Sequence, residues 1–94
     1  MLLLARFRIV GHSMEPQIKT GETILASGIP YWFKTPKIND IVAFEEKGDV
    51  LIKRIVRIAG DRYFIQGDNK KDSLDSRKFG FISRKQILGK VFYK

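Results

Sequence analysis

Short apolar runs separated by polar turns make up most of this 94-residue chain. Residues 6–9 alternate polar and apolar side chains, which is the pattern of a strand with one buried face. Residues 41–44 are apolar throughout and suit a buried strand. Residues 50–58 form the longest run and are rich in the β-branched residues that favour strands. The pattern predicts a protein built mainly of short strands.

The rest of the chain fits the same class. Further strands are predicted at residues 22–27, 63–66, 79–82 and 87–93. Loops are predicted at residues 28–37 and 70–77, and residues 13–20 and 83–86 each suit at most one turn of helix. Ninety-four residues allow one modest core. We therefore predict an all-β fold, a compact and partly closed antiparallel sheet, with residues 1–94 as one domain.

The amino-acid composition limits the kinds of catalytic and metal sites that the chain can form. The chain has no cysteine, which excludes a disulfide framework, a thiolate nucleophile and a cysteine-bound zinc. His12 is the single histidine, so a multi-histidine metal site is excluded too, and we expect no metal and no cofactor. The net charge of +8 suits an anionic partner, such as nucleic acid or a membrane surface, and equally serves solubility. No stretch approaches the ~20 apolar residues that cross a bilayer, so a soluble or peripheral domain is expected.

One serine stands where a strand is expected to end. The first apolar run closes at Gly11, Ser13 follows two residues later, and Met14 and Pro16 turn the chain away. This arrangement presents a hydroxyl beside an extended edge that could hold a peptide. A serine hydroxyl is a weak nucleophile without a positioned base. His12 is its neighbour, and adjacent residues in extended chain point to opposite sides, so a Ser-His-Asp triad is not expected.

Lys53 is the alternative base. It lies in the longest predicted strand, where alternation puts Leu51, Lys53 and Ile55 on one face. Burial among apolar side chains would lower the pKa of the lysine and leave a neutral amine that can act as a general base. A strand lysine can instead extend its ammonium to water. The strand pattern alone leaves both interpretations open.

Five segments resemble, in the same order, the successive motifs of type I signal peptidases, and they cover most of the chain. They are Gly-His-Ser-Met-Glu-Pro at residues 11–16, Asn-Asp-Ile-Val-Ala-Phe at 39–44, Ile-Lys-Arg-Ile-Val at 52–56, Gly-Asp-Asn at 67–69 and Ser-Leu-Asp-Ser-Arg-Lys-Phe-Gly at 73–80. Residues 87–91 also match the closing strand of that family. The first motif alone would be weak evidence, whereas the whole set is specific.

The resemblance implies a serine endopeptidase of the signal peptidase catalytic type, with a Ser/Lys dyad. Ser13 would be the nucleophile and Lys53 the general base, and Ser73 would hold the lysine amine by a hydrogen bond. The Ser13 backbone N–H would be the main oxyanion donor. Gly11 stands where some relatives carry a hydroxyl that adds a second donor.

The resemblance also implies two supporting ion pairs and two substrate pockets. Arg54 would pair with Asp68, and Asp75 with Arg77. The pocket for the residue before the cut would be lined by Ile9, Met14, Ile18, Leu51 and Ile52. The pocket two residues further back would be lined by Phe7, Val10 and Ile24. Shallow apolar pockets favour small residues such as alanine, and an extended peptide would pair with free strand edges.

The chain departs from the family pattern in several places. It shows no N-terminal transmembrane anchor, the segment between Lys53 and residue 67 is short, and Asn39 and Gln17 replace the usual glycine and threonine. Small anchor-less relatives are maturation proteases for nickel superoxide dismutase, and the compact chain is similar to them. The expected substrate is therefore a preprotein leader or a specific metalloenzyme precursor. The expected location is peripheral at a membrane, where Trp32 and the leading leucines would favour contact, or the cytoplasm.

Two other classes of protein share features with this sequence. A basic β-barrel could bind nucleic acid through its charge and the aromatic residues 31–33, but the basic residues are dispersed and no such motif is present, so no nucleic-acid partner is expected. A self-cleaving repressor would share the Ser/Lys chemistry and cut its own chain upstream of the nucleophile. Only twelve residues precede Ser13, and the motif at residues 67–80 is foreign to that group.

Overall fold

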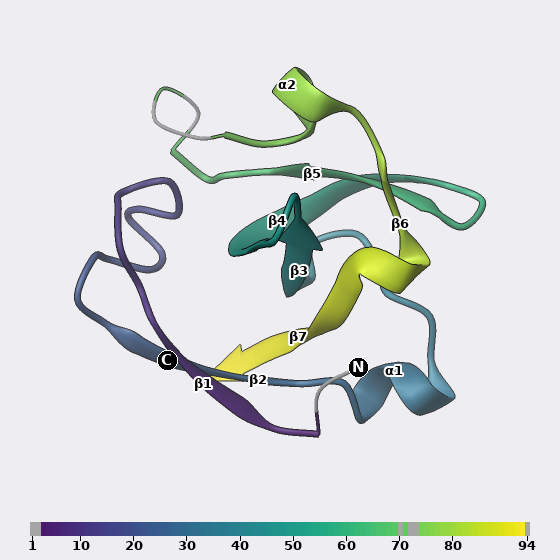
Figure 1. Cartoon of the computed structure of the whole chain (residues 1–94), viewed down its shortest axis with the longest axis horizontal. Helices are drawn as coiled ribbons and strands as arrows, with labels where there is room; N and C mark the ends of the chain where they lie inside the picture. Colours follow the sequence, from purple (N-terminus) through teal and green to yellow (C-terminus); the bar gives the residue numbers. More distant parts are fainter. Residues whose placement is uncertain (1–2, 70, 72–73, 94) are drawn as a thin grey trace.

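The computed structural model describes residues 3–69, 71 and 74–93. Within these ranges, seven strands form one antiparallel sheet in the order β1-β2-β7-β3-β4-β5-β6 (Figure 1). The strands are β1 (Ala5–Arg8), β2 (Thr23–Ser27), β3 (Ile41–Glu46), β4 (Asp49–Ala59), β5 (Arg62–Gln66), β6 (Ile82–Ser83) and β7 (Ile87–Tyr93). The predicted all-β class is confirmed. The sheet is open, with β1 and β6 at its two edges.

Three short helical segments connect the strands: α1 (Pro30–Phe33), α2 (Ser76–Phe79) and the 3₁₀ turn η1 (Arg84–Gln86). The turn of helix expected near residues 83–86 is confirmed. The prediction of a loop at residues 28–37 was wrong for residues 30–33, which form α1. The predictions of a loop through residue 77 and of extended chain from residue 79 were wrong where α2 lies. Pro30 pre-sets the first helical φ of α1, and the Asp75 side chain caps α2 by accepting from the Arg77 N–H.

Apolar residues cover both faces of the curved sheet, because successive side chains of a strand point to opposite sides. In β3, Val42 and Phe44 face one side and Ala43 faces the other. The first cluster consists of Tyr31, Val42, Phe44, Ile55, Tyr63, Ile65, Ile82 and Ile87. The second cluster consists of Met14, Ile18, Ile24, Ala26, Ala43 and Ile52. The second cluster therefore joins the sheet to the turn that follows β1.

Two stretches of strand edge have no strand beside them in the described structure. The strand β1 pairs with β2 alone, since it is the first strand of the sheet. Residues 49–53 of β4 pair with β3 on one side, and pairing with β5 begins only at Arg54, opposite Gln66. Both free stretches lead along the chain toward the region of Ser13 and Lys53.

The three adjacent aromatic residues of α1 divide between the core and the surface. Tyr31 is buried in the first cluster and donates its hydroxyl to Asp40 Oδ2 at 2.7 Å. Trp32 and Phe33 are 55% and 81% exposed. Among the described residues, the helices are all too short to cross a membrane.

Candidate active site

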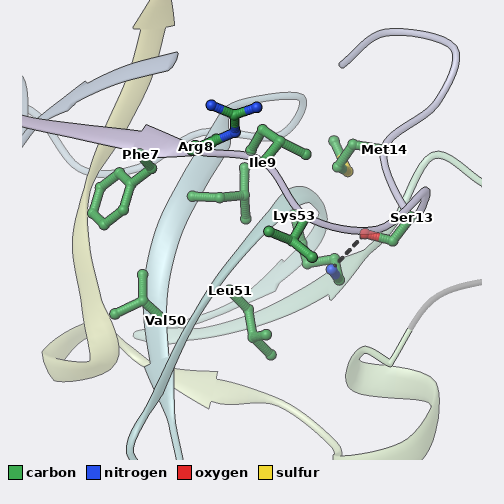
Figure 2. Close-up of a pocket in the computed structure, with 10 residues that line it drawn as sticks. Phe7, Arg8, Ile9, Ser13, Met14, Val50, Leu51 and Lys53 are labelled. Atoms are coloured by element: carbon green, nitrogen blue, oxygen red, sulfur yellow. Dashed lines mark hydrogen bonds between the residues drawn. The ribbon is translucent and has the colours of Figure 1, made fainter. Parts of the chain in front are cut away.

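The fold brings Ser13 and Lys53 into direct contact. Ser13 lies in the turn after β1, and Lys53 lies in the middle of β4. The Lys53 Nζ atom donates a hydrogen bond to Ser13 Oγ at 2.8 Å (Figure 2). These are the two residues that the sequence singled out as nucleophile and base.

Lys53 is buried rather than extended to water, since only 5% of it is exposed. As expected from alternation, its neighbours Leu51 and Ile55 pack on the same side of β4, in and against the first cluster. The residue opposite Lys53 in β3 is Val42, which also belongs to that cluster. The amine is thus held between apolar side chains, with its end at the serine.

The turn at residues 67–69 holds the serine loop in place. The Asn69 N–H donates to the Ser13 carbonyl oxygen at 2.7 Å, and the Asn69 side-chain amide donates to the His12 carbonyl oxygen at 3.1 Å. The Asp68 N–H donates to Met14 Sδ at 3.4 Å. Asn69 belongs to one of the matched motifs, but the family resemblance implied no role for it. Its contacts span segments far apart in the sequence, so no local pattern could reveal them.

Arg54 and Asp68 form the first expected ion pair. Arg54 Nε and one terminal nitrogen each lie 2.9 Å from a different oxygen of Asp68. The other terminal nitrogen donates to the Asn39 carbonyl oxygen at 2.9 Å. The hydrogen bonds to Asp68 raise the pKa of Arg54 further above its usual value. This two-pronged contact ties the turn at residues 67–69 directly to β4, next to Lys53.

Asp75 and Arg77 form the second expected pair, and Asp75 is completely buried. The guanidinium donates to both carboxylate oxygens of Asp75, at 3.0 and 2.9 Å. Asp75 also accepts from the Gly67 N–H at 3.0 Å. The pair therefore fixes Gly67, at the start of the turn whose Asn69 holds Ser13, and acts on the serine only through that turn.

The other residues considered for catalysis are Ser73, Gly11, His12 and the backbone N–H of Ser13. Ser73 lies outside the described residues. Gly11 adopts φ +95°, a conformation suited to glycine, and its N–H donates to Thr20 Oγ1 at 3.3 Å. His12 lies at the surface, with Nδ1 2.7 Å from Glu15 Oε2. In the described part of the chain, the Ser13 N–H donates to no protein acceptor.

A groove of about 240 Å³ runs between the two free strand edges and ends at the Ser13–Lys53 contact (Figure 2). Six of the residues predicted to bind substrate line it: Phe7, Ile9, Val10, Met14, Leu51 and Ile52. Arg8 and Val50 also line it and were not predicted. Ile18 and Ile24 do not line it but lie in the second cluster, packed with Met14 and Ile52.

Known proteins similar to this chain belong to the family that its motifs resemble. A family model described as "Signal peptidase, peptidase S26" matches residues 1–62 and 58–94. A probable signal peptidase I-2 of Synechocystis sp. is 24% identical over 92% of this chain and 60% of its own length. A probable thylakoidal processing peptidase 2 of Arabidopsis thaliana is 26% identical over 87% of this chain and 35% of its own. Signal peptidase IB of Staphylococcus aureus is 25% identical, over 98% and 78% respectively. The chain thus spans about a third to three-fifths of the first two relatives.

Proposed function

The chain belongs to the signal peptidase family, peptidase S26, and we propose that it is a serine endopeptidase that removes N-terminal leader peptides from preproteins. The observation that carries the proposal is the 2.8 Å contact between Lys53 Nζ and Ser13 Oγ. A buried amine beside a serine hydroxyl, at the end of a groove between two free strand edges, is what a Ser/Lys peptidase requires.

The proposed reaction begins when the neutral Lys53 amine takes the proton of Ser13 as Oγ attacks the peptide carbonyl carbon. The Ser13 N–H, for which the described residues offer no protein acceptor, would stabilise the negative oxygen of the tetrahedral intermediate. The carbon–nitrogen bond then breaks as Lys53 gives its proton to the leaving amine, and the acyl group of the substrate remains bound to Ser13 Oγ as an ester. Lys53 next takes a proton from water as the water oxygen attacks the ester carbon. The bond from that carbon to Oγ breaks, and Lys53 returns the proton to Oγ. Bond and proton changes balance without any cofactor.

The groove suits a substrate in extended conformation. Its walls come from residues 7–10, at the end of β1 and just after it, and from residues 50–52 of β4. The first stretch leads along the chain to Ser13 and the second to Lys53. The part of the substrate before the cut would lie between these edges, parallel to both strands, and would hydrogen-bond to their free backbone groups. Phe7, Ile9 and Met14 would then limit the side chains on that side to small ones.

We also propose that the protein works at an anionic membrane surface. Trp32 and Phe33 project from α1, and Leu3 and Leu4 are exposed just before β1. The Leu3 carbonyl accepts from Ser27 Oγ, which also accepts from the Ile29 N–H, so the chain start lies close to the beginning of α1. Aromatic and aliphatic side chains on a protein of charge +8 are suited to the interface of an anionic bilayer.

The decisive experiment is cleavage of a peptide whose leader ends in Ala-x-Ala, by the wild type and by Ser13→Ala and Lys53→Ala. We expect each variant to lower kcat by about 10²–10⁴-fold or more, because Ser13→Ala removes the nucleophile and Lys53→Ala removes the general base. Lys85→Ala, an exposed lysine on η1, is the matched control and should keep full activity. A folded Lys53→Ala protein with wild-type kcat would refute the dyad.

The same assay with and without anionic vesicles separates the two proposed settings. A strong increase in the cleavage rate when vesicles are added supports leader removal at a membrane. Equal activity in both conditions favours a soluble maturation protease acting on a dedicated precursor.

A further inference from the structure

A second cavity, of about 230 Å³, lies beside the free stretch of β4. It is lined by Glu46, Lys47, Asp49, Leu51, Leu74, Lys78 and Phe79. Leu51 also lines the substrate groove, so this one side chain borders both spaces. The volume is below the range of about 300–1,000 Å³ typical of small-molecule sites and suits a single large side chain.

The two spaces lie on opposite faces of β4. Ile52 belongs to the second cluster, and by alternation Val50 faces the same way, toward the groove wall at Phe7. Leu51 packs instead against the first cluster, as does Phe79 of α2. In Figure 2 the Leu51 side chain points away from Phe7 and Ile9. The free edge of β4 therefore separates the groove from the second cavity.

A peptide that adds to this edge must alternate its own side chains in the same way. If the residue before the cut faces Met14 and Ile52, the second residue before the cut faces Leu51. We infer that the second cavity is a specificity site for an apolar side chain at this second position of the leader. The inference rests on the proposed function, and it adds a requirement that the small-residue groove does not impose.

The chemistry of the cavity supports an apolar occupant. Leu51, Leu74 and Phe79 supply its hydrophobic lining, and charged residues of both signs line it as well. Leu74 is 58% exposed, although it immediately precedes the completely buried Asp75 that caps α2. The anchored neighbour holds this exposed leucine at the cavity, where a substrate side chain would cover it.

The test uses three soluble peptides that share Ala at the first and third positions before the cut. One has Ala at the second position, one has Leu there, and one has Leu at the fourth position instead. For the wild type we expect kcat/KM to be about tenfold higher with Leu at the second position than with Ala, as one apolar pocket contact can provide. Leu at the fourth position should give no such gain.

The matched variants are Leu74→Ser and Ile38→Ser, since Ile38 is similarly exposed at 53% but lies outside both cavities. Leu74→Ser should bring the Leu/Ala ratio close to one and leave kcat/KM for the Ala peptide within about twofold of wild type. Ile38→Ser should keep the wild-type ratio.

An unchanged ratio in Leu74→Ser, whatever its absolute rate, would overturn the inference, as would a preference at the fourth position alone. Failure of the proposed function looks different: no peptide is cleaved, or Ser13→Ala cleaves as fast as the wild type.

Discussion

The backbone N–H of Asn69 donates a 2.7 Å hydrogen bond to the carbonyl oxygen of Ser13. The contact fixes the main chain of the proposed nucleophile against a turn that comes from the other half of the sequence. That turn is held in its own position by Arg54 through Asp68, and by Asp75 through Gly67. The geometry of the Ser13–Lys53 pair therefore depends on residues that touch neither reacting atom.

Asp68→Ala should lower both activity and stability. The substitution removes two 2.9 Å hydrogen bonds to Arg54 and releases the turn that holds Ser13. We expect kcat to fall by about 10–100-fold with little change in KM, because the nucleophile is misplaced rather than the substrate unbound. The free energy of unfolding should fall by about 1.5–3 kcal/mol. Peptide kinetics and urea denaturation measure the two effects.

The control is Asp61→Ala, at an exposed turn between β4 and β5. It should leave kcat at the wild-type value and change the free energy of unfolding by no more than about 0.5 kcal/mol. If Asp68→Ala keeps wild-type kcat, the ion pair has no part in positioning Ser13.

His12→Ala should retain at least about half of the wild-type kcat, because the imidazole contacts Glu15, whereas the hydrogen bond to Ser13 Oγ comes from Lys53. The variant tests directly whether a histidine takes part in catalysis, since His12 is the single histidine of the chain. A loss as large as that expected for Lys53→Ala would show that the histidine takes part in proton transfer.

The same variant should change the titration of Glu15. The hydrogen bond with His12 holds the pKa of Glu15 below its ordinary value of 4.5. A depressed folded pKa favours the fold above the unfolded value, and the advantage disappears as the pH falls through the folded value. His12→Ala should therefore move the Glu15 pKa upward, which carbon-13 NMR of the carboxyl group measures. An unmoved pKa would contradict the contact.

Gly89→Ala should destabilise the sheet where β7 passes β2. A Cβ atom at this position would lie 2.7 Å from the Ser27 carbonyl carbon and 2.8 Å from its oxygen, and both are backbone atoms that cannot move aside cheaply. We expect a loss of about 1–3 kcal/mol in the free energy of unfolding. Thermal and urea denaturation measure it, with the exposed strand substitution Val56→Ala as the control. Equal stability of Gly89→Ala and wild type would mean that the two backbones can separate.

Trp32 is the single tryptophan and gives a direct test of the membrane proposal. Its side chain is 55% exposed, so insertion into an anionic bilayer surface should shift its fluorescence to shorter wavelength. The shift should appear with anionic vesicles, weaken at high salt as the +8 charge is screened, and be absent with zwitterionic vesicles.

Phe33→Ser should weaken vesicle binding, whereas Phe92→Ser, at another exposed aromatic on β7, should not. No spectral shift at low salt, or equal losses in the two variants, would rule out α1 as the docking surface.

The sequence by itself determined the strands and the proposed reacting pair. Alternation and glycine turns placed the strands, because the strand period is a property of neighbouring residues. The matched motifs pointed to Ser13 and Lys53, although their spelling could not bring the two atoms together. The strand pattern did not predict the short helices α1 and α2, because a proline at the start of α1 and the Asp75 cap of α2 favour these helices locally.

Only the tertiary structure decided what depends on contacts between distant segments. The order of the strands left residues 49–53 of β4 unpaired on one side and so created an edge with a cavity on each face. Packing placed Ile18 and Ile24 in the second cluster rather than on the groove wall, and it gave Asn69 its hold on Ser13. These relationships join segments from the two halves of the chain, and no periodicity along a sequence encodes which distant backbone groups will meet.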